Sequence, residues 1–135
     1  MKKWFGLLVI LILVGCNNGK NDFMATNNKE EYQQQQQKIE QILKEDKHVK
    51  RVTAVFTKDS AIVGIEVKPF SKWNKQKYEK KWKKEVKKAL PDRNVVVSTD
   101  LKLIMETDKL AKKQLSEKKL DKKIKDLKKL EKEET

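Results

Sequence analysis

The sequence predicts an α+β fold: a small αββαβ domain in which helices cover one face of a three-stranded sheet, with an extra C-terminal helix. Two β-like runs meet across the polar pair Lys58-Asp59. An amphipathic helical pattern follows from Ser71 to Leu90, and a short β-branched run from Asn94 to Ser98 comes next. These three observations define the core of the predicted domain.

The first fifteen residues are typical of a lipoprotein signal peptide. Lys2 and Lys3 precede an apolar run over residues 4–14, which is shorter than the ~20 residues of a spanning helix. The run ends in Leu-Val-Gly-Cys16, which resembles a bacterial lipobox. We expect cleavage before Cys16 and a diacylglyceryl lipid, with acyl chains such as palmitate, on its thiol, because stable anchoring needs two chains. The alternative is an ordinary signal peptide with an incidental cysteine.

The chain is strongly basic, with 33 Lys and Arg against 20 Asp and Glu and a net charge of +13. Loss of Lys2 and Lys3 with the signal peptide leaves +11. This balance favours an anionic partner, such as a lipid surface or another polyanion. Cys16 is the only cysteine, so no internal disulfide is expected.

Residues 16–27 are mostly polar and are expected to form a flexible tether. The domain is expected over residues 28–113. Asn28 and Glu31 have the spacing of a capping box, and the first helix should run to about Asp46. Its apolar stripe comprises Tyr32, Ile39, Ile42 and Leu43. The Gln33 to Gln37 tract fits a solvated helix surface, although it also resembles a low-complexity tract.

The hairpin has a register that the apolar pattern predicts. A two-residue loop at Lys58-Asp59 places Thr57 opposite Ser60 and makes three apolar pairs on one face: Phe56 with Ala61, Ala54 with Val63, and Val52 with Ile65. The other face is mixed, with Val55 opposite Ile62, Thr53 opposite Gly64, and Arg51 opposite Glu66. A slip by one residue would break the apolar set.

The helix from Ser71 to Leu90 carries the candidate functional site. One arc of it is apolar: Tyr78, Trp82, Val86 and Ala89. The opposite arc is basic, and with an aromatic residue at the helix entry it forms the predicted anionic-surface contact: Trp73, Lys77, Lys80, Lys84 and Lys87. The alternative is a solvated face with Trp73 folded under Phe70.

After the third strand, Thr99 or Asp100 should cap a further helix that docks on the domain. Its docking side is expected to contain Leu101, Ile104, Met105, Ala111 and Leu115. Residues 114–135 form a lysine-rich tail whose thin seam is Leu120, Ile124 and Leu127. This tail is expected to be a largely exposed, fraying helix, with a partner-binding helix as the alternative.

Three segments carry a resemblance to a known family: VTAVFTKDSAIVGIEV over residues 52–67, KKEVKKALP over residues 83–91, and NVVVSTD over residues 94–100. Together with the lipobox, residues 49–108 resemble the YhcN/YlaJ sporulation lipoproteins. The resemblance implies a BON-like αββαβ domain at the forespore or inner spore membrane, with a role in spore formation, germination or outgrowth. The lysine-rich segment from Gln114 differs from the expected Gly-containing segment and closing aromatic-proline motif.

No catalytic constellation is visible, so we expect a protein that is not an enzyme and has no metal or soluble cofactor. His48 is the only histidine and is expected to be exposed to solvent, with no second histidine or free cysteine beside it. The glycines are too scattered for a phosphate-binding loop.

Two partner classes fit the lysines as alternatives to a membrane surface or a partner protein of the envelope or spore. One is an anionic cell-wall polymer. The other is nucleic acid, which an exported, lipidated chain seldom meets, and the strands lack the paired aromatics of an RNA-binding sheet. The outer face of the cytoplasmic membrane is the expected location.

Overall fold

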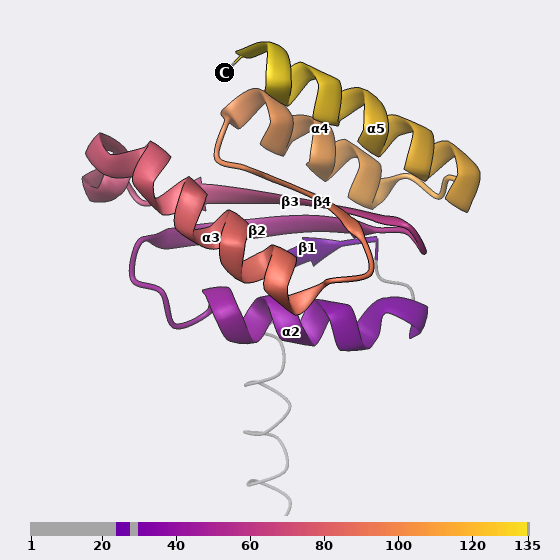
Figure 1. The fold of residues 1–135 in the computed structure, drawn as a ribbon, viewed down its shortest axis with the longest axis horizontal. Coiled ribbons are helices and arrows are strands. Elements are labelled where there is room, and N and C mark those ends of the chain that lie inside the picture. The colour runs from indigo at the N-terminus through magenta and orange to yellow at the C-terminus, as the bar shows by residue number, and fades with distance from the viewer. Residues whose placement is uncertain (1–23, 28–29, 135) are drawn as a thin grey trace, which may run out of the picture.

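A four-stranded mixed sheet lies between two layers of helices (Figure 1). The computed structural model describes residues 24–27 and 30–134. The strands are β1 (Met24–Thr26), β2 (Val49–Phe56), β3 (Ser60–Val67) and β4 (Asn94–Ser98), in the spatial order β1-β2-β3-β4. β2 and β3 are antiparallel, whereas β1 is parallel to β2 and β4 is parallel to β3. The α+β class is therefore confirmed.

The β2–β3 hairpin has the predicted register. Val52 lies opposite Ile65, Ala54 opposite Val63, and Arg51 opposite Glu66. The backbone N–H of Thr57 donates to the carbonyl of Ser60 over 2.8 Å, so Lys58-Asp59 forms the predicted two-residue loop. Alternation of apolar side chains across the two strands is thus sufficient to determine this pairing.

β1 corrects two expectations, a flexible tether up to residue 27 and a sheet of three strands. Met24 is buried, and the Asn27 side chain donates to the carbonyl of Phe56 over 3.1 Å. The edge of β2 offers unpaired backbone groups, and three residues of β1 pair with them. The rest of the expected tether and the capping residue Asn28 lie outside the described residues.

α2 (Gln33–Leu43) and α3 (Lys75–Ala89) cover the face that the apolar pairs form (Figure 1). A 3-10 turn, η1 (Glu30–Tyr32), precedes α2, and another, η2 (Pro69–Asn74), precedes α3. The glutamine tract lies within α2, as the solvated-helix interpretation predicts. The core on this face includes Tyr32, Ile39, Leu43, Trp82 and Val86.

The mixed face of the sheet is also covered, which corrects the expectation of helices on one face only. α4 (Leu101–Lys112) and α5 (Glu117–Glu134) pack there (Figure 1). A second core joins strand and helix side chains: Val55, Ile62, Val96, Leu103, Leu110, Leu120, Ile124 and Leu127. Gly64 leaves room for α4, because a Cβ there would lie 3.0 Å from Cγ1 of Ile104.

α5 is part of the core, and the expectation of a largely exposed, fraying tail is wrong. Leu120, Ile124 and Leu127 are all buried against the sheet and α4. The Thr57 hydroxyl donates to the Asp121 carboxylate over 3.0 Å, which ties α5 to the hairpin. The thin seam was sufficient for docking because the mixed face supplied the matching apolar side chains.

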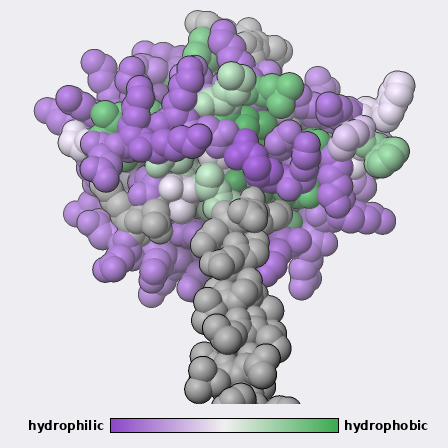
Figure 2. Space-filling view, turned by 180° about the vertical axis from the view of Figure 1, so that it is seen from behind, coloured by the Kyte–Doolittle hydropathy of each residue, from purple (hydrophilic) through white to green (hydrophobic). Residues whose placement is uncertain are grey.

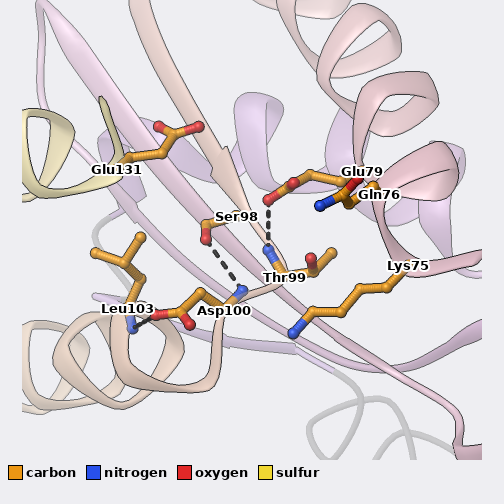
Figure 3. A pocket seen from close by; sticks show the side chains of 8 residues that line it. All are labelled: Lys75, Gln76, Glu79, Ser98, Thr99, Asp100, Leu103 and Glu131. Carbon is orange, nitrogen blue, oxygen red and sulfur yellow. Dashed lines mark hydrogen bonds between the residues drawn. The ribbon is translucent and has the colours of Figure 1, made fainter. Parts of the chain in front are cut away.

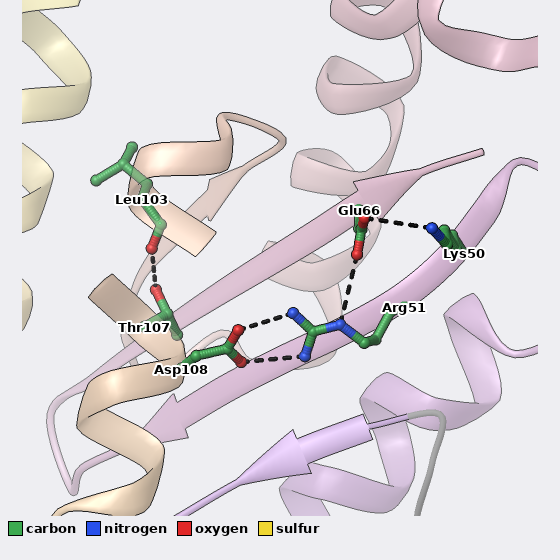
Figure 4. A network of polar contacts seen from close by, with 6 residues as sticks. All are labelled: Lys50, Arg51, Glu66, Leu103, Thr107 and Asp108. Atoms are coloured by element: carbon green, nitrogen blue, oxygen red, sulfur yellow. Dashed lines mark hydrogen bonds and ion pairs between the residues drawn. The ribbon is translucent and has the colours of Figure 1, made fainter. Parts of the chain in front are cut away.

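The docking side of α4 matches the prediction in part: Ile104 is buried and Ala111 and Leu115 pack against the core, but Leu101 and Met105 do not. Leu103, Ile104, Thr107 and Leu110 are buried, whereas Leu101 and Met105 are 56% and 60% exposed. Asp100 caps the helix as predicted, accepting from the Leu103 N–H over 3.1 Å. The orientation of α4 depends on a polar network: the Arg51 guanidinium donates to both oxygens of Asp108, at 3.1 and 2.7 Å, and pairs with Glu66 (Figure 4).

Replacement of Ile124 by Ala should lower the free energy of unfolding by about 2–5 kcal/mol, because it opens a cavity beneath α5. Urea denaturation monitored by circular dichroism measures this change. Leu130→Ala on the same helix is the matched control, because Leu130 is partly exposed, and should cost less than about 1 kcal/mol. Equal, small effects of both substitutions would show that α5 is not docked.

Candidate functional site

α3 separates its apolar and basic side chains onto two faces. Trp82 and Val86 are fully buried, and Tyr78 packs partly buried against the same core. Lys77, Lys80, Lys84 and Lys87 are all exposed on the other side. Burial of the apolar stripe fixes the helix, so the four lysines are held toward solvent.

The four predicted lysines have no acidic partner among the side chains that the structure describes. Within the described part of the chain, no carboxylate oxygen lies within 4 Å of the ammonium groups of Lys77, Lys80, Lys84 or Lys87. By contrast, Lys81 pairs with Asp46 at 3.7 Å and Lys83 with Glu131 at 3.4 Å. Three of the four lysines, with Lys81 and Glu85, line one shallow depression of about 440 Å³. We call Lys77, Lys80, Lys84 and Lys87 the lysine face.

Trp73 does not lie on α3 but in the preceding turn η2. It is 92% exposed, and Phe70 in the same turn is 94% exposed. The alternative in which Trp73 folds under Phe70 is therefore wrong. The structure presents two large aromatic side chains to solvent directly before the basic helix.

His48 is half-buried and bonded, which corrects the expectation of a solvent-exposed histidine. Its Nδ1 lies 2.7 Å from the Ser71 hydroxyl, and its ring stacks on Tyr78 with the ring centres 4.1 Å apart. The His48 carbonyl accepts from the Lys68 N–H over 3.0 Å. Ser71, predicted as the first residue of the helix, instead lies in η2 and links this turn to His48. No short-range pattern in the sequence shows this pairing, because the two residues come together only when β2 and β3 align.

The Asp46 carboxylate lies next to the stacked rings of His48 and Tyr78 and bonds to two neighbouring groups. Its carboxylate accepts from the Trp82 indole over 2.8 Å and from the His48 backbone N–H over 2.9 Å. Burial opposes ionisation of Asp46, but these hydrogen bonds and nearby Lys81 outweigh it, so the pKa of Asp46 lies below its ordinary value. The ionised carboxylate thus links the end of α2 to α3.

A second depression, of about 200 Å³, lies where β4 ends and α4 begins (Figure 3). Its polar groups largely bond to one another. The Glu79 carboxylate accepts from the Thr99 N–H over 2.9 Å, and the Ser98 hydroxyl accepts from the Asp100 N–H over 3.1 Å (Figure 3). The depression is therefore a packed junction of α3, β4 and α4, with Glu131 of α5 at its rim.

Two other kinds of feature are absent from the residues that the structure describes. No group of three or more His, Cys, Asp or Glu side chains in this part of the chain is placed to hold a metal ion. None of the described helices is both long and apolar enough to cross a membrane. The predicted lipidation residue Cys16 lies outside the described residues.

Comparison with protein-family models shows where the chain belongs. The model described as sporulation lipoprotein YhcN/YlaJ matches residues 15–129. The chain is a member of this family. The match begins one residue before Cys16 and ends within α5, so it extends beyond the segment that the sequence resemblance covered and includes most of the lysine-rich C-terminal region. Comparisons with curated proteins and with solved structures gave no match.

Membership of the sporulation lipoprotein family makes the protein a lipoprotein of the cell envelope that is associated with a membrane. The family is not described as an enzyme family.

Asp46→Asn should lower the free energy of unfolding at pH 7 by about 1–3 kcal/mol, because Asn has one acceptor oxygen for two donors. The folded-state pKa of Asp46 is lowered. Its ionised form therefore stabilises the fold above about pH 4, and this contribution is lost as the pH falls further. Urea unfolding at pH 7 and pH 3 should thus show a smaller difference between parent and variant at pH 3. A difference that does not change with pH would contradict the role of the carboxylate charge.

Proposed function

We propose that this chain is a non-enzymatic lipoprotein whose lysine face contacts the anionic surface of the membrane that holds it. A diacylglyceryl lipid on Cys16 provides the anchor. The location is the outer face of the cytoplasmic membrane, or the forespore or inner spore membrane, and the role lies in spore formation, germination or outgrowth. The carrying observation is the set of four exposed lysines, which have no acidic partner among the described residues, on a helix whose other side is buried.

The size of the electrostatic attraction determines what the lysine face can do. Each lysine near an anionic membrane surface contributes about 1 kcal/mol, so four contribute about 4 kcal/mol, equivalent to a Kd of about 1 mM. That is too weak to recruit the protein by itself. With the domain already tethered, the same attraction is sufficient to orient it, because the tether keeps the local concentration of membrane high.

The non-enzymatic part of the proposal is supported by the only histidine. The His48 ring is bonded to Ser71 and stacked on Tyr78, while the Asp46 carboxylate faces the His48 backbone and Trp82 rather than the ring. Asp46, His48 and Ser71 therefore do not form a relay for nucleophilic catalysis, which requires the carboxylate to orient the ring. Their arrangement is that of a structural link between η2 and α3.

Reversal of the lysine face should greatly reduce binding to anionic vesicles. We expect the unlipidated mature chain, residues 17–135, to co-sediment with vesicles of phosphatidylglycerol and phosphatidylcholine at millimolar lipid and low salt. Lys77→Glu, Lys80→Glu, Lys84→Glu and Lys87→Glu together should reduce the bound fraction at least tenfold, because attraction becomes repulsion.

The matched control reverses four exposed lysines of α5 on the opposite side of the sheet: Lys118, Lys119, Lys122 and Lys123. Both variants carry the same net charge, so only the position of the lysines differs. Retention of binding by the α5 variant supports the proposal. Equal losses would show that only net charge matters, and no binding by the parent chain would contradict membrane contact. Binding to purified teichoic acid but not to vesicles would favour a cell-wall partner instead.

The anchor has an independent test. Cys16→Ala should move the full-length protein from the membrane fraction to the soluble or secreted fraction, because the variant has no thiol to acylate. Metabolic labelling with a fatty acid should mark the parent and not the variant. A variant that stays in the membrane fraction without label would show that the anchor is not a lipid on Cys16.

A further inference from the structure

Four large apolar side chains at one end of the domain are largely exposed to solvent. Phe70 and Trp73 in η2 are more than nine-tenths exposed, and Leu101 and Met105 of α4 are more than half exposed. A cluster of exposed apolar side chains on a protein surface marks an interaction site. We call these four residues the apolar end.

The strand topology brings η2 and the beginning of α4 together. β3 and β4 are parallel, so both end at the same edge of the sheet, and η2 follows β3 while α4 follows β4. The depression in Figure 3 is consistent with this topology, because it is lined by the first turn of α3, which directly follows η2, and by the end of β4 and the first turn of α4. Both segments lie at the left of Figure 1. In Figure 2, the view from behind, apolar and weakly polar side chains protrude at the corresponding right-hand edge of a mostly hydrophilic surface.

The Arg51–Asp108 pair determines which way the exposed stripe of α4 faces. Leu101, Met105 and Asp108 follow one another at helical spacings of four and three residues, so they share one side of α4. The Asp108 carboxylate binds Arg51, which lies near the start of β2 and opposite Glu66 near the end of β3 (Figure 4). The side that carries Leu101 and Met105 is therefore turned toward the edge of the sheet where η2 lies.

The aromatic turn is held by specific bonds. Ser71, between Phe70 and Trp73, is buried and bonded to His48, and its N–H donates to the Lys68 carbonyl over 2.9 Å. The Lys68 N–H in turn donates to the His48 carbonyl. Because these bonds to His48 fix the turn, the positions of its two exposed aromatic side chains are fixed as well.

The length of chain before β1 favours contact of this end with the membrane. Cys16 lies eight residues before Met24, which allows a reach of at most about 29 Å. Met24 is opposite Val52, about 10 Å from the start of β2 and about 20 Å from the hairpin loop at Lys58. Turning the hairpin loop toward the membrane would use most of the available length, whereas the end of β3, which η2 follows, lies opposite Val49, about 10 Å from Met24 along the strands and two strands away.

We propose that the apolar end inserts into the interfacial region of the bilayer that carries the lipid anchor. Tryptophan and phenylalanine suit this region, and methionine and leucine extend the apolar contact into the acyl boundary. This inference rests on the proposed membrane anchoring and adds the part of the domain that enters the lipid, which places the lysine face beside it at the headgroups.

Charge favours a lipid surface over a second copy of the chain as the occupant. Lys68 and Lys72 are exposed beside the two aromatic residues, and the lysine face follows within α3. Two copies that met through this end would bring these like charges together, which is unfavourable. An anionic headgroup layer has the opposite charge, and the acyl region beneath it can accommodate the apolar side chains.

The test uses Trp73 as a native reporter in the processed, lipidated protein. The mature chain has two tryptophans, and Trp82 is fully buried. In vesicles of phosphatidylglycerol and phosphatidylcholine with brominated acyl chains, we expect quenching of the Trp73 emission, a shift to shorter wavelength and a several-fold loss of acrylamide accessibility relative to the unlipidated chain in buffer. Trp73→Phe should remove all three changes and leave the Trp82 signal.

Two further variants separate insertion from general proximity. Leu101→Ser with Met105→Ser leaves both tryptophans intact and should reduce the quenching by brominated lipid at least twofold, because it removes two of the proposed apolar contacts with the bilayer. Both side chains are exposed, so their loss does not open the core. Lys58→Trp in the Trp73→Phe background places a reporter on the hairpin loop, which should stay accessible to acrylamide.

Trp73 that is as accessible in vesicles as in buffer, in protein that sediments with those vesicles through its lipid, would overturn the inference. A concentration-dependent shift of the Trp73 emission in buffer without lipid would also overturn it, in favour of self-association. Either outcome leaves the lysine-reversal and Cys16 results standing, so failure of the inference is distinguishable from failure of the proposed function.

Discussion

The register of the β2–β3 hairpin decides which side chains meet which helices. One face of the paired strands is apolar throughout and receives α2 and α3. The other face combines apolar pairs with Gly64 and the Arg51–Glu66 pair, and it receives α4 and α5. A shift by one residue would exchange these faces and remove the partner of every helix. The positions of the lysine face, η2 and the exposed stripe of α4 all follow from this pairing.

The domain divides its surface chemistry between its elements. α3 carries the lysine face, for which the described part of the chain offers no acidic partner, whereas Lys81 and Lys83 on the same helix pair with Asp46 and Glu131. η2 adds two aromatic side chains at the entry of that helix. A polyanion that bound only through charge would not contact these aromatic residues, and a purely apolar partner would not pair with the lysines. A membrane interface offers both kinds of contact in adjacent layers.

Much of the domain could be predicted because its signals are local. The hairpin register, the stripe of α3 and the exposed lysines follow from periodicity alone, and the lipobox and short motifs point to the family. The fourth strand, the second covered face and the docking of α5 could not be predicted, because they depend on pairing between distant segments. The residues around Met24 have no strand pattern of their own and form β1 only by pairing with the edge of β2. Leu120 and Ile124 look like a thin seam in the sequence, and they are buried only because they pack on Val55 and Ile62. The His48–Ser71 link is hidden for the same reason.

The central claim is that the domain faces its membrane with the lysine face of α3. Depth measurement by electron paramagnetic resonance tests it most directly, with single spin labels at Lys84→Cys, Lys122→Cys and Lys58→Cys in the lipidated protein on anionic vesicles. The account predicts that the label at position 84 lies close to the headgroups and is relaxed by a lipid-attached nickel chelate, while the labels at positions 122 and 58 remain accessible to an aqueous relaxing agent. Equal accessibility at all three positions, or a label at position 122 that lies nearer the membrane than the one at position 84, would contradict it.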